Sequence, residues 1–111
     1  MTDKIVVLST CSSREEAESI ARQLVDQRLA ACVSVVPSVG SIYRWQGAVE
    51  RAEEVLLIVK SSRALFGQLR ARIELLHSYS TPEIVALPIV DGAEAYLNWM
   101  TAEMGAASAS E

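Results

Sequence analysis

The spacing of apolar positions changes once in the first third of the chain, which predicts a strand followed by a helix. Lys4–Thr10 is short and rich in β-branched residues, as is typical of a strand buried on both faces. A helix is predicted to start after Ser12 and Ser13, because each serine precedes a glutamate by three residues, the spacing of a capping box. It ends near Leu29, and its apolar face comprises Ala17, Ile20, Ala21, Leu24, Val25 and Leu29.

The middle of the chain predicts a long β-hairpin. Its first arm covers Ala31–Trp45, and Pro37, which lacks a backbone donor, predicts a bend within that arm. Gln46 and Gly47 are typical turn residues, and the second arm covers Ala48–Lys60. We therefore expect the tip of the hairpin at Gly47.

A second helix and a fourth strand follow the hairpin. Ser61 and Ser62 are predicted to cap the helix, which ends around His77. Ile84–Val90 has the composition of a strand. Pro88 lies within that run, which favours an edge strand or a bulge.

The chain is predicted to end in a short third helix. Asp91 and Glu94 have capping-box spacing, Gly105 ends the helix, and residues 106–111 are predicted to be frayed. The element order is β-α-β-β-α-β plus this helix, which is typical of the ferredoxin-like α+β fold in a single domain of residues 1–105. The right-handed crossover rule places both longer helices on one face of a four-stranded sheet.

The predicted hairpin is longer than the domain that carries it. At roughly 3.3 Å per residue one arm reaches about 45–50 Å, whereas a globule of this size has a diameter of about 34 Å. An isolated two-stranded ribbon is only marginally stable in water, so we predict that it pairs with another copy of the chain in a closed, head-to-tail ring. The alternative is a ribbon that curls back on its own sheet. The overhanging apolar residues are Ile42, Tyr43, Trp45 and Val49.

Composition narrows the class of protein. The chain has 111 residues, of which 50% are hydrophobic, and a net charge of −4. This length and hydrophobic content suit one domain with its own core. The negative net charge argues against a nucleic-acid-binding surface, and no apolar run in the sequence is long enough to span a bilayer. Residues 1–4 lack the features of a secretory leader, so we expect a cytoplasmic protein. The two cysteines, Cys11 and Cys32, lack the spacing of a redox or zinc motif.

Several segments resemble the CutA family of divalent-cation tolerance proteins in one continuous register. They include Leu29–Glu50, His77–Val90, Glu54–Lys60 and the late Tyr96-Leu97-x-Trp99. The resemblance implies a ferredoxin-like subunit in a homotrimer, tolerance of copper and other divalent cations, and Cu(II) binding. It also implies a similarity in trimeric architecture to the PII signalling proteins.

Two residues are candidate metal ligands, His77 and Cys11. His77 is the only histidine, and an exposed imidazole suits Cu(II); the alternative is a helix C-terminal residue favoured by the dipole. Cys11 precedes a predicted helix N-terminus, which lowers a thiol pKa; the alternative is a small hydrophobic residue in a turn. In the CutA family a copper-associated histidine matches His77. Some members have a second histidine directly before it, at the position that Leu76 occupies in this chain. In some members a copper-associated cysteine matches Ser9.

The remaining candidates concern packing and the surface between subunits. Cys32 is expected to pack in a core strand, and we do not expect an enzyme, since nucleophile-elbow, P-loop and dinucleotide motifs are missing from the sequence. The function expected is a trimeric divalent-cation tolerance protein that binds copper. The alternative is a PII-like signalling or scaffold module that binds a small ligand or partner at the cleft between subunits. The residues expected to line that cleft are Tyr43, Trp45, Lys60, Tyr79 and Glu83. The alternative is that these residues only pack against each other in the subunit interface.

Overall fold

The computed structural model describes residues 1–105. Its strands and helices follow one another in the order expected from the sequence. A 3₁₀ turn, Arg63–Leu65, precedes the second helix. The frayed end expected for residues 106–111 lies outside the described residues. The elements are β1 (Lys4–Cys11), α1 (Arg14–Asp26), β2 (Cys32–Trp45), β3 (Ala48–Ser62), α2 (Phe66–Leu76), β4 (Val85–Pro88) and α3 (Glu94–Glu103).

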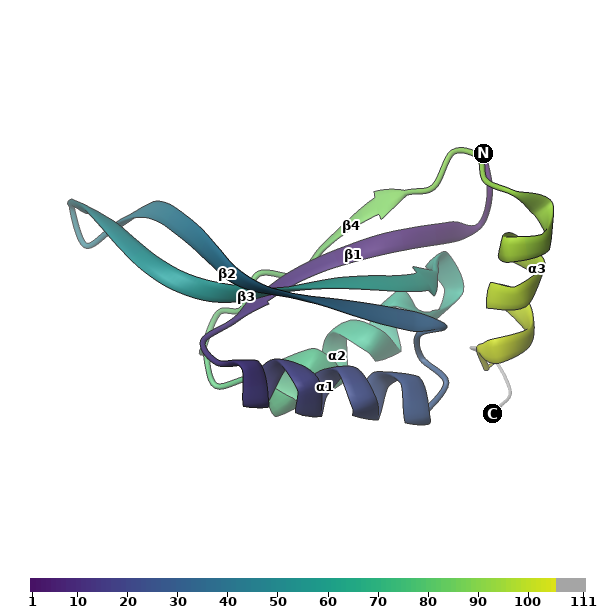
Figure 1. Cartoon of the computed structure of the whole chain (residues 1–111), viewed down its shortest axis with the longest axis horizontal. Helices are drawn as coiled ribbons and strands as arrows, with labels where there is room; N and C mark the ends of the chain where they lie inside the picture. Colours follow the sequence, from purple (N-terminus) through teal and green to yellow (C-terminus); the bar gives the residue numbers. More distant parts are fainter. Residues whose placement is uncertain (106–111) are drawn as a thin grey trace.

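The strands form one antiparallel sheet in the order β2-β3-β1-β4. Helices α1 and α2 cover one face of this sheet, and α3 stands at one end of it (Figure 1). The predicted ferredoxin-like α+β arrangement with an additional C-terminal helix is therefore confirmed. β4 is an edge strand that ends at Pro88, as expected from the proline. Within residues 1–105, no helix has both the length and the apolar composition that crossing a bilayer requires.

The N-terminus of α1 has the predicted cap. The Oγ of Ser13 accepts a hydrogen bond from the backbone N–H of Glu16 (3.1 Å), while a carboxylate oxygen of Glu16 accepts from the N–H of Ser12 (3.4 Å). Both serines therefore share the capping box. The helix ends at Asp26, earlier than predicted, because Arg28 adopts a left-handed conformation with φ of 61° that a helix cannot contain.

The caps predicted for the other two helices are wrong. β3 continues to Ser62, so Ser61 is still a buried strand residue, and its Oγ donates to the carbonyl of Leu29 (2.7 Å). The side chain of Ser62 makes no capping bond. Among the described residues, Asp91 accepts from the N–H of Gly92 (2.9 Å) and not from the start of the helix, and α3 begins without a side-chain cap.

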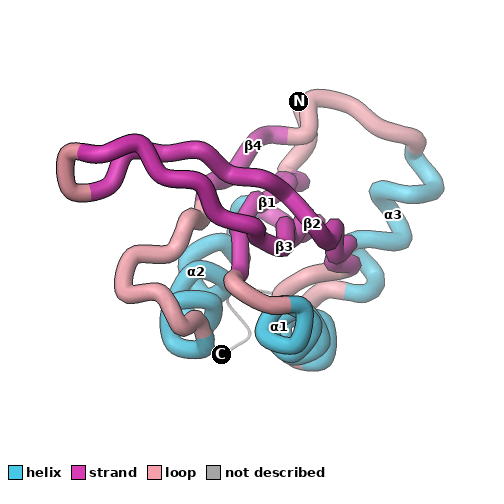
Figure 2. Tube along the Cα trace, turned by 60° about the vertical axis from the view of Figure 1, so that its left-hand side comes forward, coloured by secondary structure: helices cyan, strands magenta, loops and turns pink. Residues whose placement is uncertain are grey.

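The hydrophobic core lies between the helices and one face of the sheet (Figure 2). Side chains alternate along β3, so Leu57 and Val59, which are fully buried, face α1 and α2, while Ile58 and Lys60 point to the opposite face. Neither α1 nor α2 covers this opposite face (Figure 1). We call it the open face, and its residues on β1, β3 and β4 include Val6, Leu8, Leu56, Ile58, Lys60, Val85 and Leu87.

The hairpin of β2 and β3 projects beyond the rest of the molecule (Figure 1). β1 pairs with β3 only as far as Val55, so the segment beyond this point is a two-stranded ribbon. The predicted bend is an irregularity between Val36 and Val39, where Ser38 has φ of 63°, and the tip is at Gln46-Gly47 as expected. The ribbon extends outward and does not curl back on its own sheet, which leaves Ile42, Tyr43, Trp45 and Val49 exposed.

Candidate functional site

The loop after α2 folds back against the end of β1 and the first turn of α1. At this junction the ligand atoms of Cys11, Glu16 and His77 all lie within 4.8 Å of one another. The structure thus brings the two candidate metal ligands together and adds a carboxylate. Whether this cluster is a metal site depends on which lone pairs its side chains leave free.

His77 has both ring nitrogens engaged. Its Nε2 lies 2.7 Å from the carbonyl oxygen of Thr10, and its Nδ1 accepts a hydrogen bond from the backbone N–H of Tyr79 (3.0 Å). A carbonyl only accepts, so Nε2 carries the proton and the imidazole is neutral. The expectation of an exposed His77 is wrong: the side chain is fully buried, because α2 ends at Leu76 and the extended backbone of His77 turns the ring inward.

Glu16 is held as a carboxylate at the edge of the same cluster. One oxygen accepts from the backbone N–H of Ser78 (2.6 Å) and lies 3.9 Å from Nδ1 of His77, and the other accepts from Ser12. Burial pushes the pKa of Glu16 upward, but the hydrogen bonds from Ser78 and Ser12 outweigh it, so the pKa lies below its usual value.

Cys11 is fully buried, and its thiol is protonated. Burial, followed by the nearby carboxylates of Glu16 and Glu54, raises the pKa of Cys11 to about 12. The expectation that a helix N-terminus lowers this pKa is therefore wrong, because desolvation and negative charge both oppose the thiolate. Cys32 was expected to pack in the core, but it is half-buried on the open face, opposite Lys60.

These three side chains do not fit a resident Cu(II) ion in this arrangement. Two donors on one ion, each at about 2.0–2.3 Å, lie at most about 4.5 Å apart, and each must direct a free lone pair at the metal. Neither nitrogen of His77 has a free lone pair, and Cys11 is a thiol. We name this hydrogen-bonded group the His77 lock; it consists of Thr10, Ser12, Glu16, His77, Ser78 and Tyr79.

Tyr79 connects the lock to the base of the hairpin. The centroid of its ring lies 4.7 Å from the centroid of the His77 ring, and its hydroxyl donates a hydrogen bond to a carboxylate oxygen of Glu54 on β3 (2.7 Å). Burial, together with the bond to Glu54, raises the pKa of Tyr79 well above its usual value. Sequence reasoning missed this role of Glu54, and it assigned Glu16 only to helix capping. Since Glu16 and Ser78 are far apart in the sequence, no local pattern signals their contact.

The other cleft candidates do not meet within one chain. Trp45 is at the tip of the hairpin and Lys60 near the opposite end of β3, so they are separated by roughly 40 Å along the strand. Glu83 is exposed in the loop before β4, and Tyr43 is exposed on the ribbon. A cleft that contains all five residues would therefore need more than one copy of the chain, and that prediction stays a prediction.

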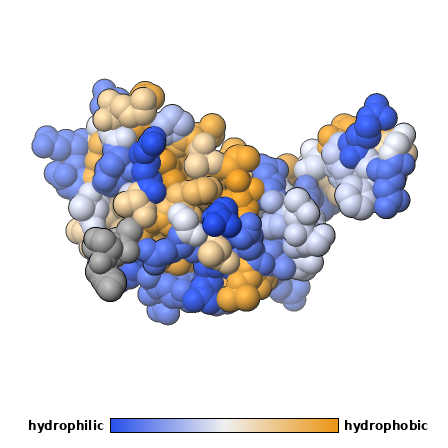
Figure 3. Space-filling view, turned by 180° about the vertical axis from the view of Figure 1, so that it is seen from behind, coloured by the Kyte–Doolittle hydropathy of each residue, from blue (hydrophilic) through white to orange (hydrophobic). Residues whose placement is uncertain are grey.

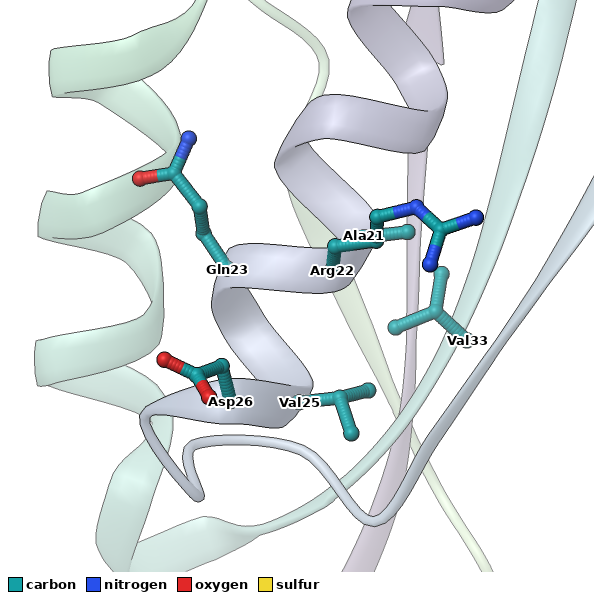
Figure 4. Close-up of a pocket in the computed structure, with 6 residues that line it drawn as sticks. All are labelled: Ala21, Arg22, Gln23, Val25, Asp26 and Val33. Atoms are coloured by element: carbon teal, nitrogen blue, oxygen red, sulfur yellow. The ribbon is translucent and has the colours of Figure 1, made fainter.

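A shallow groove of about 610 Å³ lies along α1, beside the edge strand β2 (Figure 4). Arg22 extends toward β2, whereas Gln23 and Asp26 point away from it (Figure 4). These polar groups do not converge on one point, so the groove lacks the arrangement that orients a small ligand. It contains none of the residues expected to form a site, and its lining is completed by Ala21, Val25 and Val33.

Comparison with known proteins gives a consistent result. A sequence model described as CutA1 divalent ion tolerance protein matches residues 5–103. The divalent-cation tolerance protein CutA of Thermus thermophilus is 51% identical over 100 residues, which cover 90% of this chain and 97% of that protein. The chloroplastic protein CutA of Arabidopsis thaliana is 41% identical over 86% of this chain, which spans only 53% of the plant protein. A solved structure of the Thermus thermophilus protein superposes with a TM-score of 0.90 at 50% identity and covers 92% of this chain and 99% of its own.

Proposed function

This chain belongs to the CutA1 divalent ion tolerance protein family, and we propose that it acts in divalent-cation tolerance as a cytoplasmic homotrimer. The role proposed is one of binding and assembly, not catalysis. The observation that carries the proposal is the amount of apolar surface that a single chain leaves uncovered.

Two separate surfaces of the chain are apolar and uncovered. On the ribbon, Ile42 and Trp45 expose 73% and 60% of their surface, and Figure 3 shows this part standing clear of the body. On the open face, Val85 and Leu87 of the edge strand expose 46% and 49%. Exposed apolar surface of this extent marks an interaction site, and an uncovered sheet edge favours pairing with another strand.

The two surfaces are different, so a contact between the ribbon of one copy and the open face of the next is head-to-tail. Such contacts generate a closed ring when the rotation closes. The geometry supports a ring, and the number three comes from the family resemblance. In this arrangement each ribbon is covered by a neighbour, which supplies the stability that an isolated two-stranded ribbon lacks.

Growth under metal stress tests the cellular role. A host strain that lacks its own family member is challenged with Cu²⁺ and with a second divalent cation, while it expresses this chain or a variant. We expect the chain to restore growth and the variant Trp45→Ser to restore less, because it weakens the assembly. Equal growth with the chain and with an empty vector, at matched expression, would contradict a role in cation tolerance.

Copper binding, which the resemblance implies, is proposed to take place outside the His77 lock. We expect Cu²⁺ at neutral pH to bind His77→Phe as it binds the unmodified protein, since the imidazole has no free lone pair in the folded state. Electron paramagnetic resonance of the Cu²⁺ complex checks this, because a bound imidazole nitrogen splits the signal. Nitrogen splitting that disappears in His77→Phe, in a protein that remains folded, would contradict this proposal.

A further inference from the structure

Lys60 brings a positive charge to an otherwise apolar part of the open face. The residues opposite it in the sheet are Val6 on β1 and Cys32 on β2, and Leu87 lies opposite Val6. No ion pair of Lys60 occurs within residues 1–105. When a second copy covers this face, the ammonium group loses hydration, and an anion carried by that copy stabilises it.

The two faces of the ribbon differ in charge. Residues that are paired across an antiparallel ribbon lie on the same face, so Tyr43, Trp45 and Glu50 share one face, which we call the aromatic face. The opposite face carries Arg44 and Arg51. A positively charged surface on the next copy therefore favours contact with the aromatic face and disfavours contact with the arginines.

Glu50 is the carboxylate of the ribbon that is left to bind a second copy. It is exposed, and it takes part in no ion pair within residues 1–105. The other two carboxylates of this segment are engaged inside the chain. Glu53 binds Arg51 (2.8 Å). Glu54 accepts a hydrogen bond from the hydroxyl of Tyr79 (2.7 Å).

We propose that the ribbon docks on the next copy with its aromatic face, and that Glu50 of one copy forms an ion pair with Lys60 of the other. This inference rests on the ring proposed above and names the contact that orients it. The pair matches an acid on an aromatic surface to a base on an apolar surface. It places both charges at the centre of the contact, where an unmatched charge of either kind is costly.

Two exposed aromatic side chains of α3 border the same place. The Nζ of Lys60 lies 5.9 Å from the centroid of the Tyr96 ring. The rings of Tyr96 and Trp99 are 5.5 Å apart, and the two residues expose 42% and 41% of their surface. Because Tyr43 lies opposite Glu50 on the ribbon, the ion pair brings an aromatic side chain of one copy next to these rings of the other.

Exchanging the two charges tests the ion pair. Glu50→Lys and Lys60→Glu each place like charges in contact, and each is expected to raise the protein concentration at which half of the chains are assembled by about tenfold or more. The double variant restores opposite charges and is expected to recover most of this loss. Light scattering over a dilution series measures the mass, in urea where the assembly is too tight, because urea does not screen charge.

Glu53→Lys is the matched control. It makes the same change of charge on the opposite face of the ribbon, so it is expected to leave the assembly unchanged. A double variant that is no more assembled than the single variants would overturn the proposal. Rescue of Lys60→Glu by Glu83→Lys instead of Glu50→Lys would also overturn it, because the partner of Lys60 would then be in the loop before β4.

Two further comparisons keep the test decisive. If Lys60→Glu does not fold, as judged by circular dichroism, Lys60→Met replaces it, and Glu50→Gln is then expected to have no additional effect in that variant. If Trp45→Ser lowers the mass and none of the charge variants does, the ring stands and the ion pair is wrong. If the unmodified protein is monomeric when dilute, both the ring and the ion pair are wrong.

Discussion

Replacing Trp45 with serine is expected to shift the protein from the proposed trimer to monomers at micromolar concentration. Trp45 exposes 60% of its surface in the single chain, so the substitution removes few contacts within that chain. If a neighbour covers the ribbon, each lost tryptophan weakens one interface by about 2–4 kcal/mol, which gives roughly 6–12 kcal/mol over the three interfaces of a closed trimer. Light scattering after gel filtration measures the mass, and circular dichroism shows whether the chain remains folded.

Leu75→Ser is the matched control for this prediction. Leu75 exposes 73% of its surface on α2, on the helix side of the sheet, so it presents a comparable apolar side chain away from both the ribbon and the open face. We expect its mass to remain that of the unmodified protein. A Trp45→Ser protein that keeps the full mass, or an unmodified protein that is a well-folded monomer when dilute, would contradict the assembly proposed above.

The elements and their order follow from the sequence because the responsible signals are local. Alternation and helical spacing specify which residues of β3 and α1 face the core, and Gln46-Gly47 specifies the tip of the hairpin. The predicted caps at Ser61 and Ser62 are wrong because β3 runs two residues further than its apolar pattern, which ends at Lys60. A polar strand end and a helix cap have the same composition, so spacing alone does not distinguish them.

The properties of the candidate site depended on contacts between distant parts of the chain. His77 binds the carbonyl of Thr10, and Glu16 binds the backbone of Ser78, across separations of 67 and 62 residues. The pKa of Cys11 is raised by burial and by carboxylates that the fold brings close, whereas the sequence shows only its place before a helix. The residue types of Cys11 and His77 therefore indicated where the cluster lies. They did not indicate which of its side chains are protonated or which lone pairs are free.

The second large effect is expected at His77, where substitution should destabilise the fold and leave metal affinity unchanged. His77→Ala leaves the carbonyl of Thr10 and the N–H of Tyr79 without their partners and opens a cavity, so the free energy of unfolding should fall by roughly 3 kcal/mol per chain. His77→Phe retains the volume of the ring but not the two hydrogen bonds. Chemical denaturation of both variants separates the two contributions, and a loss confined to His77→Ala would assign the effect to the cavity alone.

Glu16 adds a pH dependence to the same lock, and its sign follows from the lowered pKa. A carboxyl whose pKa is lower in the folded than in the unfolded state stabilises the fold above the unfolded pKa, and this contribution is lost as the pH falls through the folded pKa. The unmodified protein should therefore lose stability more steeply than Glu16→Gln below about pH 4.3, the ordinary glutamate value. Glu74→Gln, which removes an exposed carboxylate paired with Arg70 on α2, is the control and should follow the unmodified protein, because an exposed pair contributes little. Parallel stability curves for the unmodified protein and Glu16→Gln would show that the carboxylate is not held by the N–H groups of Ser78 and Ser12, and that the loop after α2 is fixed by the imidazole alone.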